Sequence, residues 1–277
     1  MLRLRLCVGD IAAWRGVDAV AVSSNRTLQG NDNPAYWRFA GRLSTNGAVR
    51  AACGPDLDAA FQSARRSGAA CEVGEASVTP AFGALAHRGC RHIVHVVAPD
   101  GLQVHAGGSD QHVQRTAQPL LRQSFGAALA AAAACRARSL ALPALGCGVN
   151  GWRPSLAAAA CAYACADAAA TTPSGGTLRR VDLVMWDDSM AQQWRETLIR
   201  LLGPSQDTMR PSSDDEWRLS PQSSATLLQR AALSTAGIDT AGRRVDECAA
   251  AAATIQRLRG RTLERMCALS GGDGCTS

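Results

Sequence analysis

The residues of this chain that could do chemistry are concentrated in one glycine-rich segment, Leu140-Ala-Leu-Pro-Ala-Leu-Gly146-Cys147-Gly148-Val149-Asn150-Gly151. A short apolar run ends there in a turn, and an alanine-rich helical stretch follows. Glycines let backbone N–H groups crowd around an anion without interference from Cβ atoms, and the N-terminus of the next helix adds a positive dipole end. The segment therefore predicts a phosphate-binding loop.

Two further polar side chains follow segments that predict strands. Asp10 comes directly after the alternating run 2–8, and Asn25 follows the apolar run 17–23. In open α/β sheets, ligands bind beyond the carboxyl ends of the strands. We therefore expect Asp10, Asn25 and the loop 146–151 to meet at one edge of the sheet.

The elements that must position these residues alternate along the chain. Hydrophobic periodicity and β-branched content predict strands at 2–8, 17–23, 91–97, 138–143 and 179–186. Helical stretches are expected between them, at 46–53, 56–66, 118–136, 154–169 and 189–202. Strands that alternate with helices imply a sheet covered on both faces, which is a three-layer α/β/α sandwich.

Charge and composition narrow the class of ligand. The 277 residues carry a net charge of +6, and all 29 basic residues are arginines because the sequence contains no lysine. Nine acidic residues balance nine arginines in 205–277, so the positive excess lies in 1–204. The arginines are scattered in the sequence and form no basic block of the kind that nucleic-acid binders show. We therefore expect an anionic small ligand and no nucleic acid, and no mechanism that needs a lysine is open.

Cysteine usage favours a reducing compartment, cytoplasmic or nuclear. The cysteines number eleven, which is odd, and the N-terminus predicts a strand instead of an apolar signal segment. No apolar run approaches the ~18 residues of a membrane span. Cys161 and Cys165 lie one helical turn apart, but no histidine or second cysteine pair is spaced to complete a metal site. Core packing is favoured for both cysteines, and we expect neither a metal nor a cofactor.

The composition changes near residue 203. The first domain is expected to span 1–203, while 204–223, rich in Gly, Pro, Ser and Asp, predicts a linker. Residues 224–277 predict a helical or partly disordered extension. Within them, Ala252–Arg265 is similar to a calmodulin-binding IQ motif but lacks one residue, which rotates a helix by roughly 100°. A calmodulin-like partner is therefore the weaker alternative to a solvated or self-packing basic helix.

Taken in order, the motifs of residues 5–202 resemble those of the macrodomain, an α/β/α module with a mixed central sheet that binds ADP-ribose. The similar segments are Gly9-Asp10-Ile11, Val17 to Asn25, Asn46 to Gly54, Cys71 to Thr79, Ile93 to Pro99 and Leu140 to Gly151. The resemblance implies the macrodomain fold, followed here by a C-terminal helical tail.

The resemblance also implies a role for each residue of the site. Asp10 would accept a hydrogen bond from the adenine amino group beside the N–H of Ile11, because a carboxylate only accepts, and it would also cap the next helix. Asn25 would bind the distal ribose hydroxyls or simply end its strand. Trp186 would stack on adenine or serve as a half-buried core residue. The diphosphate would meet the backbone of two turns, one with Gly47, Ala48 and Val49 and the other with Gly146, Cys147, Gly148, Val149 and Asn150.

The catalytic positions depart from the family pattern. An Asp that positions or activates water in one hydrolase branch is matched by Asn46, and an Asp that assists a lysine in another branch is matched by Asn150. An asparagine orients water but accepts no proton at neutral pH. Hydrolysis would therefore depend on the diphosphate of the ligand or on a substitute base such as Asp32, His87, His92 or His95. Of these, His95 lies within a strand, where a core histidine is favoured.

Three functions stay open. The favoured one is a binding module that recognises ADP-ribose, free or attached to protein. The second is an ADP-ribosyl hydrolase or O-acetyl-ADP-ribose deacetylase with a rearranged site, in which Asn46 and Asn150 would position water. The third is a scaffold whose C-terminal helices carry the interaction. The glycines at 146–151 also match a dinucleotide-binding fingerprint, but that fingerprint belongs after the first strand. The aromatic segment 30–45 replaces the family's glycine run and would close over ligand or fold onto the core.

Overall fold

The computed structural model describes residues 1–26, 38–39, 42–66, 71–101, 117–171, 176–204 and 215–235. Residues Met1–Leu227 form one compact unit. Residues Leu228–Ser277 form a second unit, of which only the end of one helix is described. Most of the aromatic segment 30–45, Asp32 and the IQ-like stretch lie outside the described residues.

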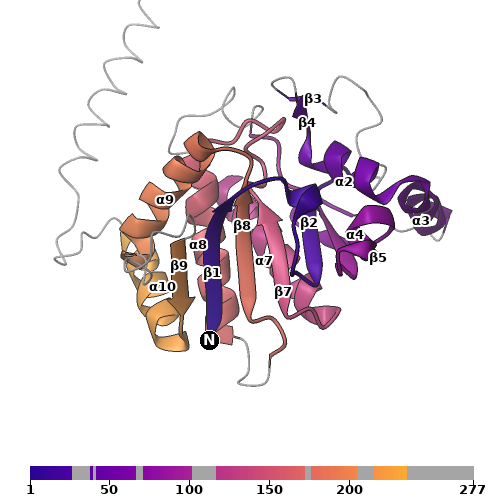
Figure 1. Cartoon of the computed structure of the whole chain (residues 1–277). Helices are drawn as coiled ribbons and strands as arrows, with labels where there is room; N and C mark the ends of the chain where they lie inside the picture. Colours follow the sequence, from indigo (N-terminus) through magenta and orange to yellow (C-terminus); the bar gives the residue numbers. More distant parts are fainter. Residues whose placement is uncertain are drawn as a thin grey trace, which may run out of the picture. The chain divides into compact units, whose positions relative to one another are not determined.

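A seven-stranded mixed sheet forms the centre of the first unit (Figure 1). The five inner strands run parallel, and the two edge strands run antiparallel to their neighbours. The carboxyl ends of the inner strands therefore lie at one edge. The order is β5 (Ala76–Pro80), β6 (His92–Val96), β2 (Ala19–Ser23), β7 (Ser139–Pro143), β8 (Arg180–Met185), β1 (Leu2–Val8) and β9 (Asp215–Leu219); a separate hairpin pairs β3 (Arg38–Phe39) with β4 (Arg42–Leu43).

Helices cover both faces of this sheet, which confirms the three-layer α/β/α prediction. One face carries the 3-10 helix η1 (Ile11–Ala13), α2 (Thr45–Cys53), α3 (Pro55–Arg66) and α4 (Gly83–His87). The other face carries α7 (Gln118–Ala134), α8 (Pro154–Thr171) and α9 (Asp188–Leu202). After β9 the chain continues into α10 (Pro221–Thr235).

The residue pattern of each element explains its place. A hydrophobic core fills each side of the sheet, and the larger core lies on the side of α7, α8 and α9. In β1, Leu2, Leu4 and Leu6 alternate with arginines and are buried in this larger core, because alternate side chains of a strand point to opposite faces. All five residues of β7 are buried, as a strand covered on both faces requires. Helix α8 buries alanines and cysteines on most sides, and these small side chains let it pack closely between α7 and α9.

The predicted strands and helices all occur, with ends within two residues of the expected positions. The structure differs in the segment 204–223, which we expected to be a linker. Within it, β9 pairs with β1, and α10 begins at Pro221. Trp217 and Leu219 of β9 are only 2% and 3% exposed and pack into the larger core. The charged residues that alternate with them on this edge strand make the segment resemble a polar linker.

Candidate functional site

A cavity of about 670 Å³ lies at the carboxyl edge of the parallel strands. The turn after β1, the end of β2, the start of α2, the β7–α8 loop and the end of β8 all contribute to it. The structure therefore brings together most of the site residues that the sequence predicted. Those lining the cavity are Asp10, Ile11, Asn25, Asn46, Ala48, Gly146, Gly148, Val149, Asn150 and Trp186.

Unpaired backbone amides distinguish the β7–α8 loop. The N–H groups of Gly148, Val149 and Asn150 donate to no acceptor in the described structure, although all three residues line the cavity. Unpaired amides cost free energy when they are withdrawn from water, and consecutive ones form a concave anion-binding site. These three N–H groups are therefore free to bind an anion, in the loop where the glycine pattern predicted a phosphate site.

Trp152 holds this loop in place through two hydrogen bonds and a close packing contact. Its indole N–H donates to the carbonyl of Pro99 at 2.8 Å, and its backbone N–H donates to the carbonyl of Gly146 at 3.0 Å. Gly146 has φ +82°, and a Cβ added there would lie 2.7 Å from the Trp152 Cδ1 atom. Only glycine satisfies both the left-handed backbone and the close approach of the ring. No sequence pattern marks Trp152 for this role, because its position against the loop depends on tertiary packing.

The side-chain amides of the two asparagines at the predicted catalytic positions both donate hydrogen bonds to backbone carbonyls. The amide nitrogen of Asn46 donates to the carbonyl of Ser23 at 2.8 Å and so ties the start of α2 to the end of β2. The amide nitrogen of Asn150 donates to the carbonyls of Ala98 and Pro99, each at 3.2 Å. Neither side chain carries a group that accepts a proton at neutral pH. Both residues hold the cavity walls in place.

Hydroxyl groups line the wall next to Asn46. Ser23, Ser24, Ser44 and Thr45 all border the cavity. Ser44 caps α2, since its Oγ accepts a hydrogen bond from the N–H of Gly47 at 3.2 Å. The Oγ of Ser24 is shielded and has no hydrogen-bond partner, so its rotation toward the cavity would break no bond. This wall suits a neutral, hydroxyl-rich group such as a sugar. Its serines follow a predicted strand, but their convergence with Thr45 requires the fold.

The turn after β1 and the end of β8 add two carboxylates and an aromatic ring to the cavity lining. Asp10 caps η1, and its Oδ1 accepts from the N–H of Ala12 at 2.8 Å, so the predicted capping role is confirmed. Asp187 caps α9 by accepting from the N–H of Met190 at 2.8 Å. Trp186 lines the cavity and also packs in part against the larger core. Asp187 was not predicted, although an acidic residue just before a helix is a recognisable signal.

Three predicted ligand-binding residues do not line the cavity. Val49 and Cys147 are buried in the two cores, and the N–H groups of Gly47 and Cys147 donate to Ser44 Oγ and to the Ala144 carbonyl. The N–H of Ala48 is likewise bound to the carbonyl of Ser44. Burial raises the pKa of the Cys147 thiol to about 12, so this thiol stays protonated. The amides of Gly47 and Ala48 therefore donate to Ser44, the residue that caps α2.

The histidines considered as substitute bases lie away from the cavity lining. His95 is fully buried, contacts Thr79 Oγ1 through Nε2 at 2.9 Å and packs edge-on against Phe61. Burial lowers the pKa of His95 to about 3, so it is uncharged at neutral pH. His87 lies on α4, and His92 begins β6 at the opposite edge of the sheet. None of the three is placed to act on a ligand in the cavity.

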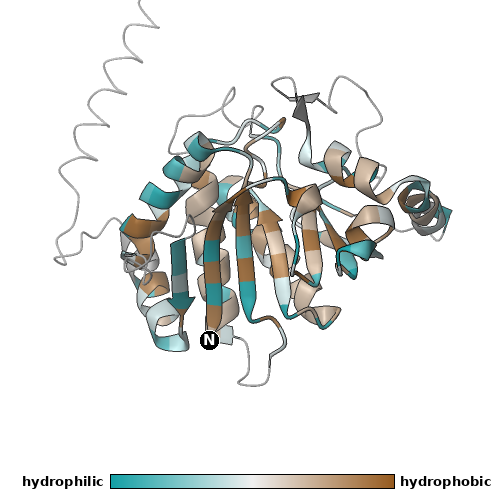
Figure 2. Cartoon of the chain, viewed as in Figure 1, coloured by the Kyte–Doolittle hydropathy of each residue, from teal (hydrophilic) through white to brown (hydrophobic). Residues whose placement is uncertain are grey.

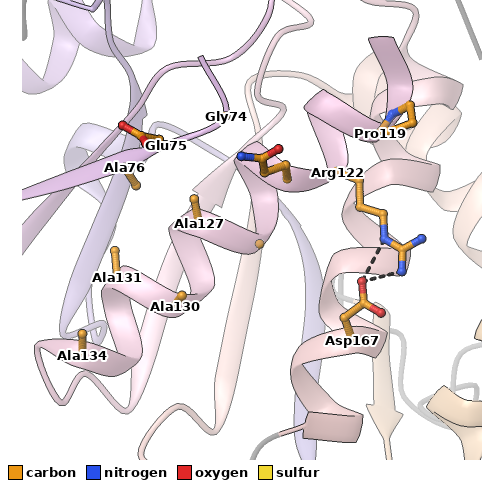
Figure 3. A pocket seen from close by; sticks show the side chains of 12 residues that line it. Gly74, Glu75, Ala76, Pro119, Arg122, Ala127, Ala130, Ala131, Ala134 and Asp167 are labelled. Atoms are coloured by element: carbon orange, nitrogen blue, oxygen red, sulfur yellow. Dashed lines mark hydrogen bonds and ion pairs between the residues drawn. The ribbon is translucent and has the colours of Figure 1, made fainter. Parts of the chain in front are cut away.

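A second hollow lies over α7 and contains none of the predicted site residues (Figure 3). Its surface comes mainly from small residues of α7 such as Ala127, Ala130 and Ala134. At one end, Arg122 forms an ion pair with Asp167 of α8 at 2.5 Å. Of its charged residues, Arg122 and Asp167 are paired with each other, and the rest of its described lining is mostly alanine and glycine.

The described residues also bear on cysteines and membranes. All eight described cysteines are free thiols, and Cys161 and Cys165 are buried in α8, as core packing requires. No three side chains of the metal-ligating types come together in the described part. No helix described here is both long and apolar enough to cross a bilayer.

Comparison with known proteins identifies the family. The sequence model for the Macro domain matches residues 33–161. An O-acetyl-ADP-ribose deacetylase of Salmonella gallinarum is 31% identical over 156 residues, which cover 56% of this chain and 73% of the relative. One of Enterobacter sp. is 30% identical over 203 residues, covering 72% of this chain and 94% of the relative.

The chain belongs to the macrodomain family. A solved Oceanobacillus iheyensis macrodomain with ADPR has the same fold, with a TM-score of 0.55, 22% sequence identity, and coverage of 72% of this chain and 92% of that one. The family resemblance predicted from the sequence motifs is thus confirmed. In this macrodomain protein, the sheet topology places the cavity where the motifs of the chain converge.

Proposed function

We propose that this macrodomain protein binds ADP-ribose, free or attached to protein, and does not turn it over efficiently. The observation that carries the proposal is the cavity itself, which combines three unpaired amides with an acidic, aromatic end and a hydroxyl-rich wall. In chemistry, these three regions suit a diphosphate, an adenine and a distal ribose. The solved relative that contains ADPR shares the fold and supports the same ligand class.

Binding without efficient turnover follows from the groups next to the hydroxyl wall. A general base must lie within hydrogen-bond reach of the water it activates. Among the residues that line the cavity, the carboxylates are Asp10 and Asp187, and each caps a helix and belongs to the region that we assign to adenine. Asn46 and Asn150 stand where a base would be needed and are bound to backbone carbonyls.

A second function has a specific observation in its favour. The relatives at 30% and 31% identity are named O-acetyl-ADP-ribose deacetylases. An ester or glycosidic bond at the distal ribose could be hydrolysed if the diphosphate of the ligand positioned the water. This alternative requires turnover by the native chain.

Calorimetry and a turnover assay separate the two functions. The full chain is titrated with ADP-ribose, and then incubated with O-acetyl-ADP-ribose and with mono-ADP-ribosylated protein while released product is followed. We expect saturable binding and release no faster than in a protein-free control. Steady release over many turnovers by the native chain would replace the binding function with the hydrolase. No heat and no thermal shift at millimolar ADP-ribose would remove both functions.

Asn46→Asp gives a matched test of the missing base. The aspartate loses the amide that donates to the Ser23 carbonyl, so we expect the free energy of unfolding to fall by about 1–3 kcal/mol. If the absent base limits hydrolysis, this variant releases product faster than the native chain in the same assay. An unchanged release rate in a folded variant that binds ADP-ribose would show that Asn46 is not what limits turnover.

A further inference from the structure

A carboxylate is buried in the middle of β8. Asp182 is 1% exposed, and its neighbours in the strand, Val181 and Leu183, belong to the larger core. Figure 2 shows that hydrophilic bands interrupt the apolar strands β1 and β8. A buried charge costs free energy unless other groups pair with it. The groups that pair with Asp182 therefore indicate what the buried charge does.

Three side chains surround the Asp182 carboxylate. Its Oδ2 accepts a hydrogen bond from the indole Nε1 of Trp14 at 3.1 Å. Its Oδ1 lies 3.1 Å from Nε of Arg180 and 3.6 Å from Nη1 of Arg5. Arg180 also donates to the backbone carbonyl of Gly16. Trp14 and Gly16 both lie in the segment that follows η1, so one buried acid fixes this segment at two points, directly and through an arginine.

Trp14 in turn holds the residues that precede it. Its backbone N–H donates to the carbonyl of Ile11 at 3.3 Å and closes η1. Its ring packs so closely on Gly9 that a Cβ added there would lie 2.9 Å from Trp14 Cζ3. Gly9, Asp10 and Ile11 all line the cavity. The indole therefore connects the buried acid with the cavity wall.

The turn held by Trp14 carries the carboxylate of Asp10. Its Oδ1 accepts from the N–H of Ala12 at 2.8 Å, and its backbone carbonyl accepts from the N–H of Ala13 at 3.0 Å. The other carboxylate oxygen has no hydrogen-bond partner among the described residues, so it is free to accept from a ligand. Hydrogen bonds weaken steeply when their distance and angle change. A small movement of this turn therefore changes what Asp10 binds.

We propose that the hydrogen-bonded pair of Trp14 and Asp182 positions Asp10 and thereby sets the preference of the cavity for adenine over hypoxanthine. This inference rests on the proposed function, which assigns adenine to the region of Asp10. A carboxylate only accepts hydrogen bonds, so it binds the exocyclic amino group of adenine and repels the oxygen that hypoxanthine carries at that ring position. Stacking on Trp186 does not distinguish the two bases, because every base has a π-face.

Trp14 and Asp182 are positioning residues, since neither is among the described residues that line the cavity. Their effect on a ligand passes through the turn that carries Asp10. A change in either residue should therefore alter the discrimination between bases, whereas a purely structural contact would lower stability and leave the discrimination as it is.

The test measures this discrimination in the full chain. Calorimetry gives the dissociation constants for ADP-ribose and for its inosine analogue, in which hypoxanthine replaces adenine, and their ratio is compared between variants. We expect the native chain to bind ADP-ribose at least about tenfold more tightly than the analogue. Trp14→Phe keeps an aromatic ring and removes the indole N–H, while Asp182→Ala removes the acceptor. Each should lower the ratio at least about threefold, and the double variant should lower it no further, because both changes break the same contact.

Trp217→Phe is the matched control. The indole N–H of Trp217 also donates to a partner distant in sequence, the carbonyl of Gly203 at 2.9 Å, but this residue lies in the larger core on β9. The control should lower thermal stability and keep the native ratio. Trp14→Phe and this control decide the outcome even where Asp182→Ala fails to fold.

A native ratio in folded Trp14→Phe, an equal fall in Trp217→Phe, or losses that add in the double variant would overturn the proposal. A native chain that binds both ligands equally would also overturn it and leave the ADP-ribose function standing. A native chain that binds neither ligand would remove that function, and this inference with it.

Discussion

Several side chains around the cavity both hydrogen-bond to the backbone and form part of the cavity lining. Ser44, Asp10 and Asp187 each cap a helix and also line the cavity. The asparagine at position 46 uses its donor on a backbone carbonyl, which an aspartate could not do. Substitutions at such positions change stability and binding together, so informative variants must separate the two.

Asp10 can be tested with two substitutions. Asp10→Ala should weaken ADP-ribose binding by roughly 1.5–3 kcal/mol, the loss of a charged hydrogen bond, and should also remove the cap on η1. Asp10→Asn keeps an oxygen that accepts from Ala12 and removes only the charge. We therefore expect the asparagine variant to retain thermal stability and to lose most of the affinity, measured by calorimetry. Native affinity in both variants would remove Asp10 from the ligand site.

The glycines of the β7–α8 loop provide a contrast between binding and folding. A Cβ added at Gly148 meets no protein atom within 4 Å, whereas one at Gly146 meets Trp152 at 2.7 Å on a left-handed backbone. Gly148→Val should therefore fold with native stability but fill the space in front of the unpaired amides of this loop and lower ADP-ribose affinity at least tenfold, on the order of 1.4 kcal/mol. Gly146→Ala should lose about 1–3 kcal/mol of stability. Thermal melts with and without ligand distinguish them, and full affinity in Gly148→Val would mean that the loop does not hold phosphate.

At the scale of elements, the cavity depends on contacts between segments that are distant in the chain. Trp152 and Asn150 fasten the β7–α8 loop to the residues after β6, and Asn46 fastens α2 to β2. Each contact ends on a backbone carbonyl. The walls are therefore held at their spacing by hydrogen bonds from side chains to the main chain.

The burial of His95 in β6 makes the stability of the fold depend on pH. Burial lowers the pKa of His95 from 6.5 to about 3, so between these values the unfolded chain binds more protons than the folded one. Stability is then fully present above about pH 6.5 and is lost as the pH falls toward 3. We expect the free energy of unfolding to drop by about 2–3 kcal/mol between pH 7 and 4.5 from this group alone. In urea titrations, His95→Gln should lose that part of the slope, and an unchanged slope would mean that His95 titrates normally.

For the whole molecule, the sheet extends beyond the boundary that the sequence suggested. Residues after 203 return to the sheet as β9, where Trp217 packs into the core and donates its indole N–H to the carbonyl of Gly203 at 2.9 Å. The strand also covers one edge of β1. The first unit therefore includes residues on both sides of the expected linker.

Truncation measures the contribution of this edge. A chain that ends at residue 203 loses Trp217 and Leu219 from the core and exposes the edge of β1. We expect its free energy of unfolding to fall by at least about 3–5 kcal/mol, the cost of removing one large buried side chain, and we expect it to aggregate. A chain that ends at residue 235 keeps β9 and α10 and serves as the control. Equal stability of the two chains would mean that β9 adds nothing to the fold.

The sequence by itself determined the inner strands and the helices that cover them, because the residue pattern of each of these elements is local. Apolar runs such as 138–143 and alanine-rich stretches such as 154–169 have a period and a composition that only a buried strand or helix satisfies. The glycine spacing at 146–151 likewise encodes a backbone that exposes amides. The ordered motifs were enough to assign the family.

Only the tertiary structure decided what depends on distant segments meeting. It showed that the amides of Gly47 and Cys147 are already bonded, that Trp152 supports the loop and that Asn150 holds the residues after β6. It also paired a tryptophan of the segment between η1 and β2 with a buried carboxylate of β8. Strand register and hydrogen-bond partners are set by packing between elements, and no local period in the sequence specifies them.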